Sequence, residues 1–210
     1  MFTAAAPPFW KNGYLLAADA SDAGVLIDPG DEVEELLAVA ARERVAVQAI
    51  LLTHAHLDHI TGVGRAKAAL GVETWLHAAD QRLYEVVEQQ GLMFGLEVQT
   101  QPPVDHFYAE DQAFEVGDLR IAVHHTPGHS PGGVCLEVRD PDGHTELIVG
   151  DTLFAGSVGR TDLPGADHAT LIRSIREVLL TFPDETPVHS GHGPDTTIGR
   201  ERRTNPFLIA

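Results

Sequence analysis

The chain has 210 residues, of which 43% are hydrophobic, and its formal net charge is −17. A chain of this length can bury roughly 70% of its unfolded surface, so we expect a single domain spanning residues 1–210. The acidic charge disfavours nucleic acid and anionic membranes as partners. The sequence shows neither a basic, apolar leader nor a run of about 18 apolar residues. These features predict a cytoplasmic protein.

Apolar runs and their spacing predict strands and helices in alternation. The predicted strands lie at about 14–17, 24–28, 47–53, 73–76, 113–116, 119–125, 134–138, 145–150 and 187–190. The predicted helices lie at about 32–44, 60–70, 79–90 and 169–180. Because hairpins and helical crossovers both connect these strands, we expect an α+β protein with two packed sheets and helices outside them.

Four ligand-type side chains follow one predicted strand within six residues: His54, His56, Asp58 and His59. Since side chains alternate along a strand, His54 and His56 point the same way. Asp58 and His59 come where the chain turns into the next helix and can face the same cavity, although Asp58 could instead only cap that helix. Imidazole together with carboxylate suits zinc, iron or manganese better than calcium.

Three later strands also end near ligand-type residues. His129 follows a sharp turn at Pro127 and Gly128, which aims it away from the preceding strand. Asp151 comes directly after a buried strand, and His192 stands between two glycines after another. Four strand ends therefore each present a ligand type, as a metal site would need.

Five motifs, in this order, resemble those of the metallo-β-lactamase-fold hydrolases, and among them the small glyoxalase II-like group. They are HAHLDH (54–59), TPGH (126–129), GDTLF (150–154), GSVGRTDLPG (156–165) and SGHGPDTTIGRE (190–201). The resemblance implies a four-layer αββα sandwich with the metals at one edge between the sheets. It also implies two divalent metal ions, with zinc favoured and iron or manganese as alternatives.

The resemblance further implies that seven side chains ligate metal, in two groups joined by one carboxylate. The first group is His54, His56 and His129, the second is Asp58, His59 and His192, and the joining carboxylate is Asp151. Class B β-lactamases usually have a cysteine in the second group, so antibiotic hydrolysis is not expected. Asp28 and Thr53 could fix the histidine tautomers from behind, although ordinary turn or strand roles explain them equally well.

Two adjacent cations would lower the pKa of a shared water toward about 7 and so supply a metal-bound hydroxide as the nucleophile. Asp58 would orient this water for attack on a thioester or ester carbonyl, whose oxyanion one metal stabilises. A thiolate leaves without a strong general acid. We therefore expect an enzyme, a thioesterase resembling hydroxyacylglutathione hydrolase, whose small-molecule thioester substrate could derive from glutathione.

Arg160 lies where glyoxalase II enzymes carry a basic residue that helps to hold a glutathione carboxylate, which its guanidinium is shaped to do. This resemblance is incomplete, because Asp162 stands where an aromatic residue is expected. The 210 residues also do not include the additional helical domain that supplies further glutathione contacts. Arg160 could instead pair with Asp162 or Asp167.

Persulfide dioxygenases resemble the chain in the same histidines and in its Gly-Arg-Thr-Asp stretch. In that alternative, a single iron held by His54, His129 and Asp151 would activate oxygen. A lactonase is a third possibility. A non-catalytic metal-binding module is a fourth, which a ligand set with an open position disfavours.

Three remaining features have structural interpretations. Cys135 is the one cysteine and is predicted to be a buried strand residue rather than a reactive thiol. Gly62 and Gly64 are weak evidence for a dinucleotide loop, because Lys67 replaces the third small residue. The loop at 91–105 is predicted to pack on the fold, with coverage of the active site or contact with a partner chain as alternatives. The oligomeric state stays open.

Overall fold

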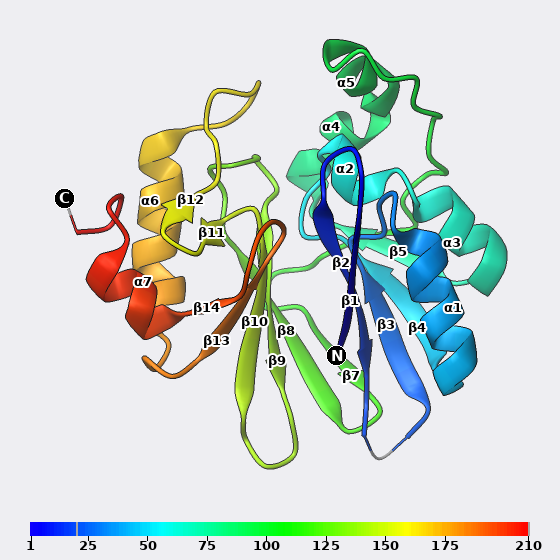
Figure 1. The fold of residues 1–210 in the computed structure, drawn as a ribbon, viewed down its shortest axis with the longest axis horizontal. Helices are drawn as coiled ribbons and strands as arrows, with labels where there is room; N and C mark the ends of the chain where they lie inside the picture. Colours follow the sequence, from blue (N-terminus) through cyan, green and yellow to red (C-terminus); the bar gives the residue numbers. More distant parts are fainter. Residues whose placement is uncertain (20, 210) are drawn as a thin grey trace.

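The computed structural model describes residues 1–19 and 21–209. These form two six-stranded sheets packed face to face, with helices on both outer sides (Figure 1). The predicted four-layer αββα sandwich is therefore confirmed. Within the described residues, no helix has both the length and the apolar character needed to cross a membrane.

The first sheet has the order β1-β2-β3-β4-β5-β6. Its strands are β1 (Phe2–Ala6), β2 (Lys11–Ala17), β3 (Ala23–Ile27), β4 (Ala46–Leu51), β5 (Glu73–Leu76) and β6 (His106–Phe107). The strands from β3 to β6 run parallel to one another, and parallel neighbours need crossover connections. Helices α1 (Val33–Glu43) and α3 (Val63–Leu70) belong to these crossovers and cover the outer face (Figure 1).

The second sheet has the order β14-β13-β10-β9-β8-β7. Its strands are β7 (Ala113–Val116), β8 (Leu119–His125), β9 (Val134–Arg139), β10 (Thr145–Gly150), β13 (Pro187–Ser190) and β14 (Thr196–Thr197). Only β10 and β13 pair in parallel, and the crossover between them carries helix α6 (His168–Glu177) and the short helix η2 (Leu179–Thr181). Helix α7 (Ile198–Thr204) lies beside α6 (Figure 1).

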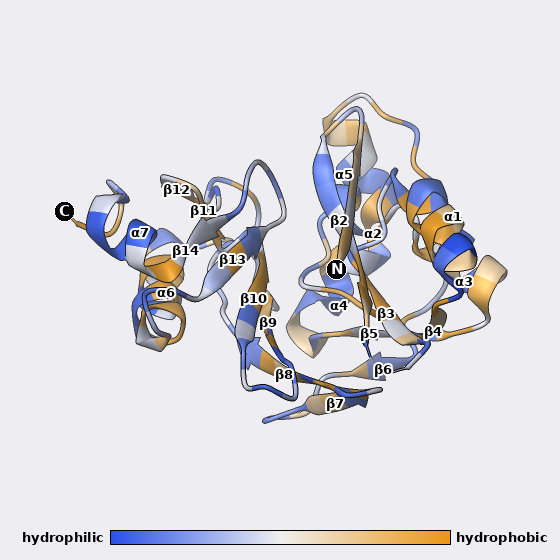
Figure 2. Ribbon diagram, turned by 60° about the horizontal axis from the view of Figure 1, so that its bottom comes forward, coloured by the Kyte–Doolittle hydropathy of each residue, from blue (hydrophilic) through white to orange (hydrophobic). Residues whose placement is uncertain are grey.

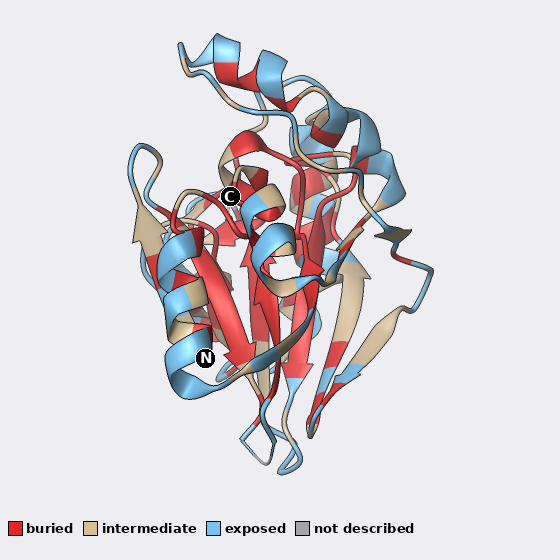
Figure 3. Ribbon diagram, turned by 90° about the vertical axis from the view of Figure 1, so that its right-hand side faces the viewer, coloured by how far each residue is buried: buried red, intermediate tan, exposed pale blue. Residues whose placement is uncertain are grey.

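Alternation along the strands divides the core into three apolar layers. In β3, Leu26 faces the outer helices, whereas Val25 and Ile27 point between the two sheets. In β10, Ile148 points between the sheets and Leu147 packs toward α6. Apolar residues therefore line the strands (Figure 2), and burial concentrates there while the outward sides of the helices stay exposed (Figure 3).

All nine predicted strands are present, and five of them, such as those at 73–76 and 119–125, have the predicted ends. Two predicted helices are wrong as continuous elements, and a third, predicted at 169–180, ends at Glu177 before η2. The helix predicted at 60–70 is divided into α2 (Leu57–Ile60) and α3, because the chain at Gly62 passes against Gly30. A side chain at Gly62 would begin 2.3 Å from the Gly30 carbonyl oxygen. This close approach, rather than nucleotide binding, accounts for that glycine.

The helix predicted at 79–90 is divided into η1 (Ala78–Asp80), α4 (Gln81–Glu85) and α5 (Val87–Met93). The prediction missed several short elements: β1, β6, β14, α7 and the small hairpin of β11 (Leu153–Phe154) and β12 (Ser157–Val158). The carboxyl ends of β4, β8 and β10 lie at one edge, where α2, α4 and α5 and the β1-β2 turn also gather (Figure 1). That edge holds the candidate site.

Candidate metal centre

The structure brings the seven predicted ligand side chains together at this edge. Among the described residues, ligand atoms within 4.8 Å of one another form three groups. The first holds His54, His56 and His129, the second holds Asp58, His59 and His192, and the third joins Asp28 to His54 and His59. The loop after β4 supplies His54 and His56 and helix α2 supplies Asp58 and His59, while His129 and His192 arrive from loops of the second sheet. The site therefore joins the two sheets across their shared edge.

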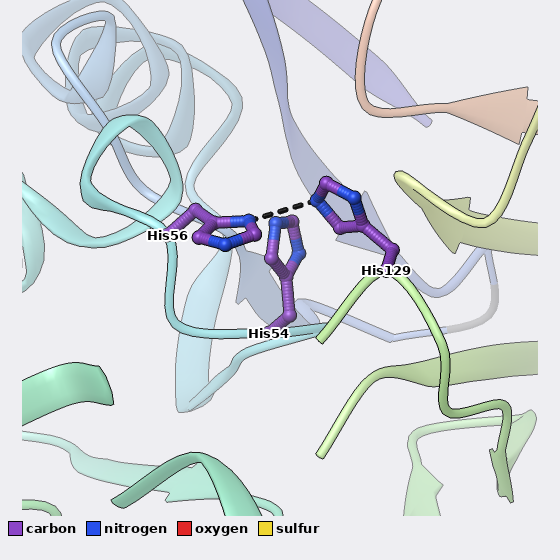
Figure 4. Close-up of side chains that lie close together, drawn as sticks. All are labelled: His54, His56 and His129. Atoms are coloured by element: carbon purple, nitrogen blue, oxygen red, sulfur yellow. Dashed lines mark hydrogen bonds between the residues drawn. The ribbon is translucent and has the colours of Figure 1, made fainter. Parts of the chain in front are cut away.

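The first group consists of three buried imidazoles. His56 Nδ1 lies 2.8 Å from His129 Nε2 (Figure 4), and the His54 ring centroid lies 4.8 Å from those of the other two. Burial and the neighbouring His129 lower the pKa of His56 to about 3. Burial and nearby histidines also hold the pKa of His54 well below its usual range. Three imidazole rings converging in this way suit a cation.

The second group contains a carboxylate. His192 Nε2 lies 3.1 Å from Asp58 Oδ2, and His59 Nε2 lies 3.8 Å from the same oxygen. Asp58 sits in the first turn of α2 and makes no capping hydrogen bond, since the N-cap position belongs to His56. The alternative role of Asp58 as only a helix cap is therefore wrong.

Asp151 lies between the two groups. Its Oδ1 is 3.3 Å from His59 Nε2, and its Oδ2 is 3.5 Å from His129 Nε2 and 3.6 Å from His192 Nε2. Among the described residues, the buried atoms Asp151 Oδ1, His59 Nε2 and His54 Nε2 have no hydrogen-bond partner. Buried polar atoms are normally paired, so this orphaned set fits divalent cations as its missing partners.

The histidine and carboxylate side chains of the second group, together with Asp151, shift each other's pKa values. Burial alone would lower the pKa of His59, but the carboxylates of Asp151, Asp58 and Asp28 raise it to about 10. Burial would likewise raise the pKa of Asp151, but His59 and other histidines lower it. Cation binding at this group would compete with a proton for His59 Nε2.

The two predicted orienting residues contact the histidines from behind. Asp28 Oδ2 lies 2.9 Å from His59 Nδ1 and accepts a 2.6 Å hydrogen bond from the Thr53 hydroxyl. The Thr53 hydroxyl oxygen also lies 3.1 Å from His54 Nδ1. These contacts leave the Nε2 atoms of His54 and His59 facing the cluster, which is the arrangement of histidines held for metal binding.

Sequence reasoning missed Asp80, whose buried carboxylate holds two ligand loops together. Its Oδ2 accepts from Ala55 N at 3.1 Å and from the Ser130 hydroxyl at 2.8 Å, and its Oδ1 accepts from Gly132 N at 2.5 Å. Burial raises the pKa of Asp80. The available signal was the position of Asp80 shortly after the end of β5, since Asp151 likewise follows the end of β10.

Gln90 in α5 was also missed. Its amide donates to Ala55 O at 3.0 Å, and its carbonyl accepts from Leu57 N at 3.1 Å. These bonds satisfy backbone groups in the histidine loop that no strand pairs. No signal in the sequence distinguishes Gln90 from an ordinary helical glutamine, because its partners lie more than 30 positions earlier.

Gly191 shows how closely the backbone approaches the cluster. A Cβ at this position would lie 2.2 Å from Asp151 Oδ1 and 2.8 Å from His59 Cε1. Any side chain would therefore displace the carboxylate that lies between the groups.

A cavity of about 600 Å³ opens above the cluster, and Arg160 is on its wall. The exposed guanidinium donates to Asp162 Oδ1 at 2.7 Å and to Asp162 Oδ2 at 2.8 Å, which is one of the predicted alternative pairings. The Arg160 carbonyl lies 2.9 Å from His129 Nδ1 and so orients that ring. Arg160 thus lines the cavity, but its side chain already has a carboxylate partner.

The segment predicted as a loop at 91–105 has two parts. Val98 and Val104 pack against the core, as predicted. Met93, the last residue of α5, and Phe94 instead line the cavity, so residues 91–93 are helical rather than loop, and coverage of the active site stays a prediction. Cys135 is fully buried in β9, as predicted, and burial raises the pKa of its thiol to about 11.

Comparison with known proteins identifies the family. The sequence profile described as "Metallo-beta-lactamase superfamily" matches residues 9–192. The chain belongs to this superfamily. It is 38% identical over 203 residues to the "Probable metallo-hydrolase YqgX" of Bacillus subtilis, covering 96% of this chain and 93% of that protein. It is 37% identical to "Hydroxyacylglutathione hydrolase GloC" of Haemophilus influenzae, covering 95% of this chain and 93% of that one.

Solved structures of the superfamily agree with the fold. TTHA1623 in a di-iron-bound form has a TM-score of 0.86 and 44% identity, with 99% of this chain and 100% of that chain covered. The BLEG-1 B3 metallo-β-lactamase has a TM-score of 0.89 and 37% identity, with 100% of this chain and 99% of that chain covered. ETHE1 from Myxococcus xanthus has a TM-score of 0.78 and 26% identity, with 98% of this chain and 82% of that chain covered. The His and Asp cluster is thus the metal-binding site of a superfamily hydrolase fold.

Proposed function

We propose that this protein binds two divalent cations and hydrolyses a thioester. The observation that carries the proposal is the position of Asp151, whose two oxygens face His59 on one side and His129 and His192 on the other. A carboxylate placed in this way can ligate two ions at once. The relative TTHA1623 in its di-iron-bound form supports the same count.

The seven ligands would be divided as the geometry groups them. One ion would take His54, His56 and His129, the other would take Asp58, His59 and His192, and both would share Asp151. Imidazole and carboxylate donors favour zinc, with iron or manganese as alternatives that depend on supply. Bound ions would lower the pKa of a water and polarise the substrate carbonyl.

Asp58 supplies the group that orients the attacking water. Burial would raise its pKa, but His59 and the hydrogen bond from His192 lower it, so the side chain is an ionised acceptor. Only about an eighth of the Asp58 side chain is exposed, and the residue lines the cavity floor. It can therefore accept a hydrogen bond from water at the floor and turn the lone pair of that water toward the carbonyl.

A thioester is the substrate type that this site supports best. A thiolate is a good leaving group, so cleavage needs no strong acid on the departing side. The similarity to GloC, which is named a hydroxyacylglutathione hydrolase, supports the same choice. S-lactoylglutathione is therefore a first substrate to test, with Arg160 as the proposed contact for a glutathione carboxylate.

The test combines metal analysis with hydrolysis assays on one preparation. We expect about two divalent ions per chain and release of thiol from thioesters. A β-lactam and a homoserine lactone belong in the same panel, because the chain also resembles BLEG-1 and because a lactone presents a comparable carbonyl. Turnover of those compounds without thioester cleavage would contradict the proposal.

A mononuclear iron dioxygenase acting on persulfides is the second candidate. His129 Nε2 lies 3.5 Å from Asp151 Oδ2, and the His54 ring adjoins His129, so two histidines and one carboxylate surround one point. Such a set suits non-haem iron. One iron per chain together with oxygen uptake on glutathione persulfide would favour this reaction over hydrolysis.

A further inference from the structure

The cavity above the metal cluster has one wall made of apolar side chains from three segments. Phe9 comes from the β1-β2 turn, Leu83 from α4, and Met93 and Phe94 from the end of α5. The Phe9 and Phe94 rings meet edge to face, with their centroids 5.5 Å apart. This contact joins the β1-β2 turn to the end of α5.

The opposite wall is apolar as well. Phe154 and Val158 come from the β11-β12 hairpin, and Leu163 and Pro164 from the loop that follows it. Charged groups among the described lining residues are confined to the cluster at the floor and to Arg160 at one side. Gln89, Gln90 and Ser157 are the uncharged polar residues of the lining, so a ligand in this cavity meets charge at its reacting end and mostly hydrocarbon along its length.

Part of this apolar surface is open to solvent. Met93 is 63% exposed and Phe94 is 43% exposed. Large apolar side chains in a mouth above a polar floor mark a binding surface rather than a packing defect. Their burial would stabilise a complex by about 25 cal/mol for each Å² removed from water.

We propose that the substrate is a hydrophobic thioester, with an apolar chain or ring that extends from the reacting carbonyl between these two walls. This inference rests on the proposed thioesterase function and narrows its substrate class. A lactoyl group is too small to fill a 600 Å³ cavity, and glutathione is polar along its length, so neither part of S-lactoylglutathione would use the apolar walls. The apolar part could belong to the acyl group or to the thiol, and the same chemistry recognises both.

The test uses two series of thioesters with the metal-loaded protein. In the first, the thiol is N-acetylcysteamine and the acyl group lengthens from acetyl to hexanoyl. In the second, the acyl group is acetyl and the thiol lengthens from ethanethiol to hexanethiol. A fully buried methylene contributes about 0.8 kcal/mol, so kcat/KM should rise up to about fourfold for each methylene in at least one series. The series that rises identifies which part of the substrate lies between the walls.

Phe94→Ala and Met93→Ala should each reduce this dependence on length, because each shortens one wall. Leu92→Ala is the matched control, since Leu92 is also apolar and 72% exposed at the end of α5 but is not among the lining residues. It should keep the dependence of the parent protein. The three residues are between 43% and 72% exposed and lie outside the buried core, so folding should persist.

The experiment distinguishes failure of the hydrophobic-substrate proposal from failure of the thioesterase proposal. Flat kcat/KM in both series, with thioesters still cleaved, would overturn the hydrophobic substrate and leave the thioesterase proposal intact. No cleavage of any thioester by protein with a full metal complement would overturn the proposed function itself. Equal loss of length dependence in Leu92→Ala and Phe94→Ala would also overturn the assignment of the wall.

Discussion

The floor and the walls of the cavity are built by different means. Floor residues such as His54 and His59 are almost fully buried, and hydrogen bonds with Asp28 and Thr53 fix their orientation. Wall residues such as Met93 and Phe94 are largely exposed, and ring and aliphatic packing holds them. The floor is thus rigid and polar, while the walls are apolar and open.

We expect the floor and the walls to control different properties, the reaction and the choice of substrate. A metal centre tolerates little displacement of its ligands, so the floor determines which reaction can occur. An apolar wall can change its shape through single substitutions without disturbing the ligands. The walls therefore determine which substrate is held over the floor.

The largest effect is expected for Asp151→Ala at the floor. Loss of the carboxylate between the two groups should remove at least one ion and reduce kcat/KM by about a thousandfold or more, which corresponds to about 4 kcal/mol of transition-state stabilisation. Metal analysis and thioester assays measure both quantities. Asp140→Ala, in the exposed β9-β10 turn, is the control and should change neither. Full activity with normal metal content in Asp151→Ala would remove the dinuclear hypothesis.

A smaller effect is expected for Asp80→Asn, beneath the floor. The amide would turn a donor toward groups that already donate, so the loops of His54 and His129 would lose their common anchor. Replacing such a support typically costs about 10- to 100-fold in metal affinity or activity. Competition with a chelator measures the affinity.

Glu201→Gln is the matched control for Asp80→Asn, because Glu201 is an equally buried carboxylate that bonds Thr196 and Asn205. It should lower thermal stability without weakening metal binding. Equal metal affinity in Asp80→Asn and the parent protein would show that the floor does not need this anchor.

The smallest effect is expected for Arg160→Ala on the wall. Arg160 is exposed and already paired with Asp162, and exposed ion pairs contribute at most about 1 kcal/mol. KM for anionic thioesters should rise about three- to fivefold, while kcat changes little. Asp162→Ala should act in the opposite direction by freeing the guanidinium. An unchanged KM in Arg160→Ala would rule out the carboxylate contact.

The floor could be predicted from sequence because its signals are local. His54 to His59 lie in six consecutive residues, and Asp151 and His192 each follow a strand. The contact between Phe9 and Phe94 in the wall could not be predicted, because these residues meet only when the β1-β2 turn and the end of α5 lie side by side in the fold. Strand β1 was missed for a similar reason, since the sequence FTAAA has a weak strand pattern and is paired by β2.

The proposal of a two-cation hydrolase is tested most directly by metal stoichiometry measured alongside activity during removal and return of the ions. We expect about two divalent ions per chain, loss of thioester hydrolysis when a chelator strips them, and recovery when zinc, iron or manganese is restored. Full turnover by the stripped protein, or a protein that binds no metal while His54, His59 and Asp151 are intact, would contradict it.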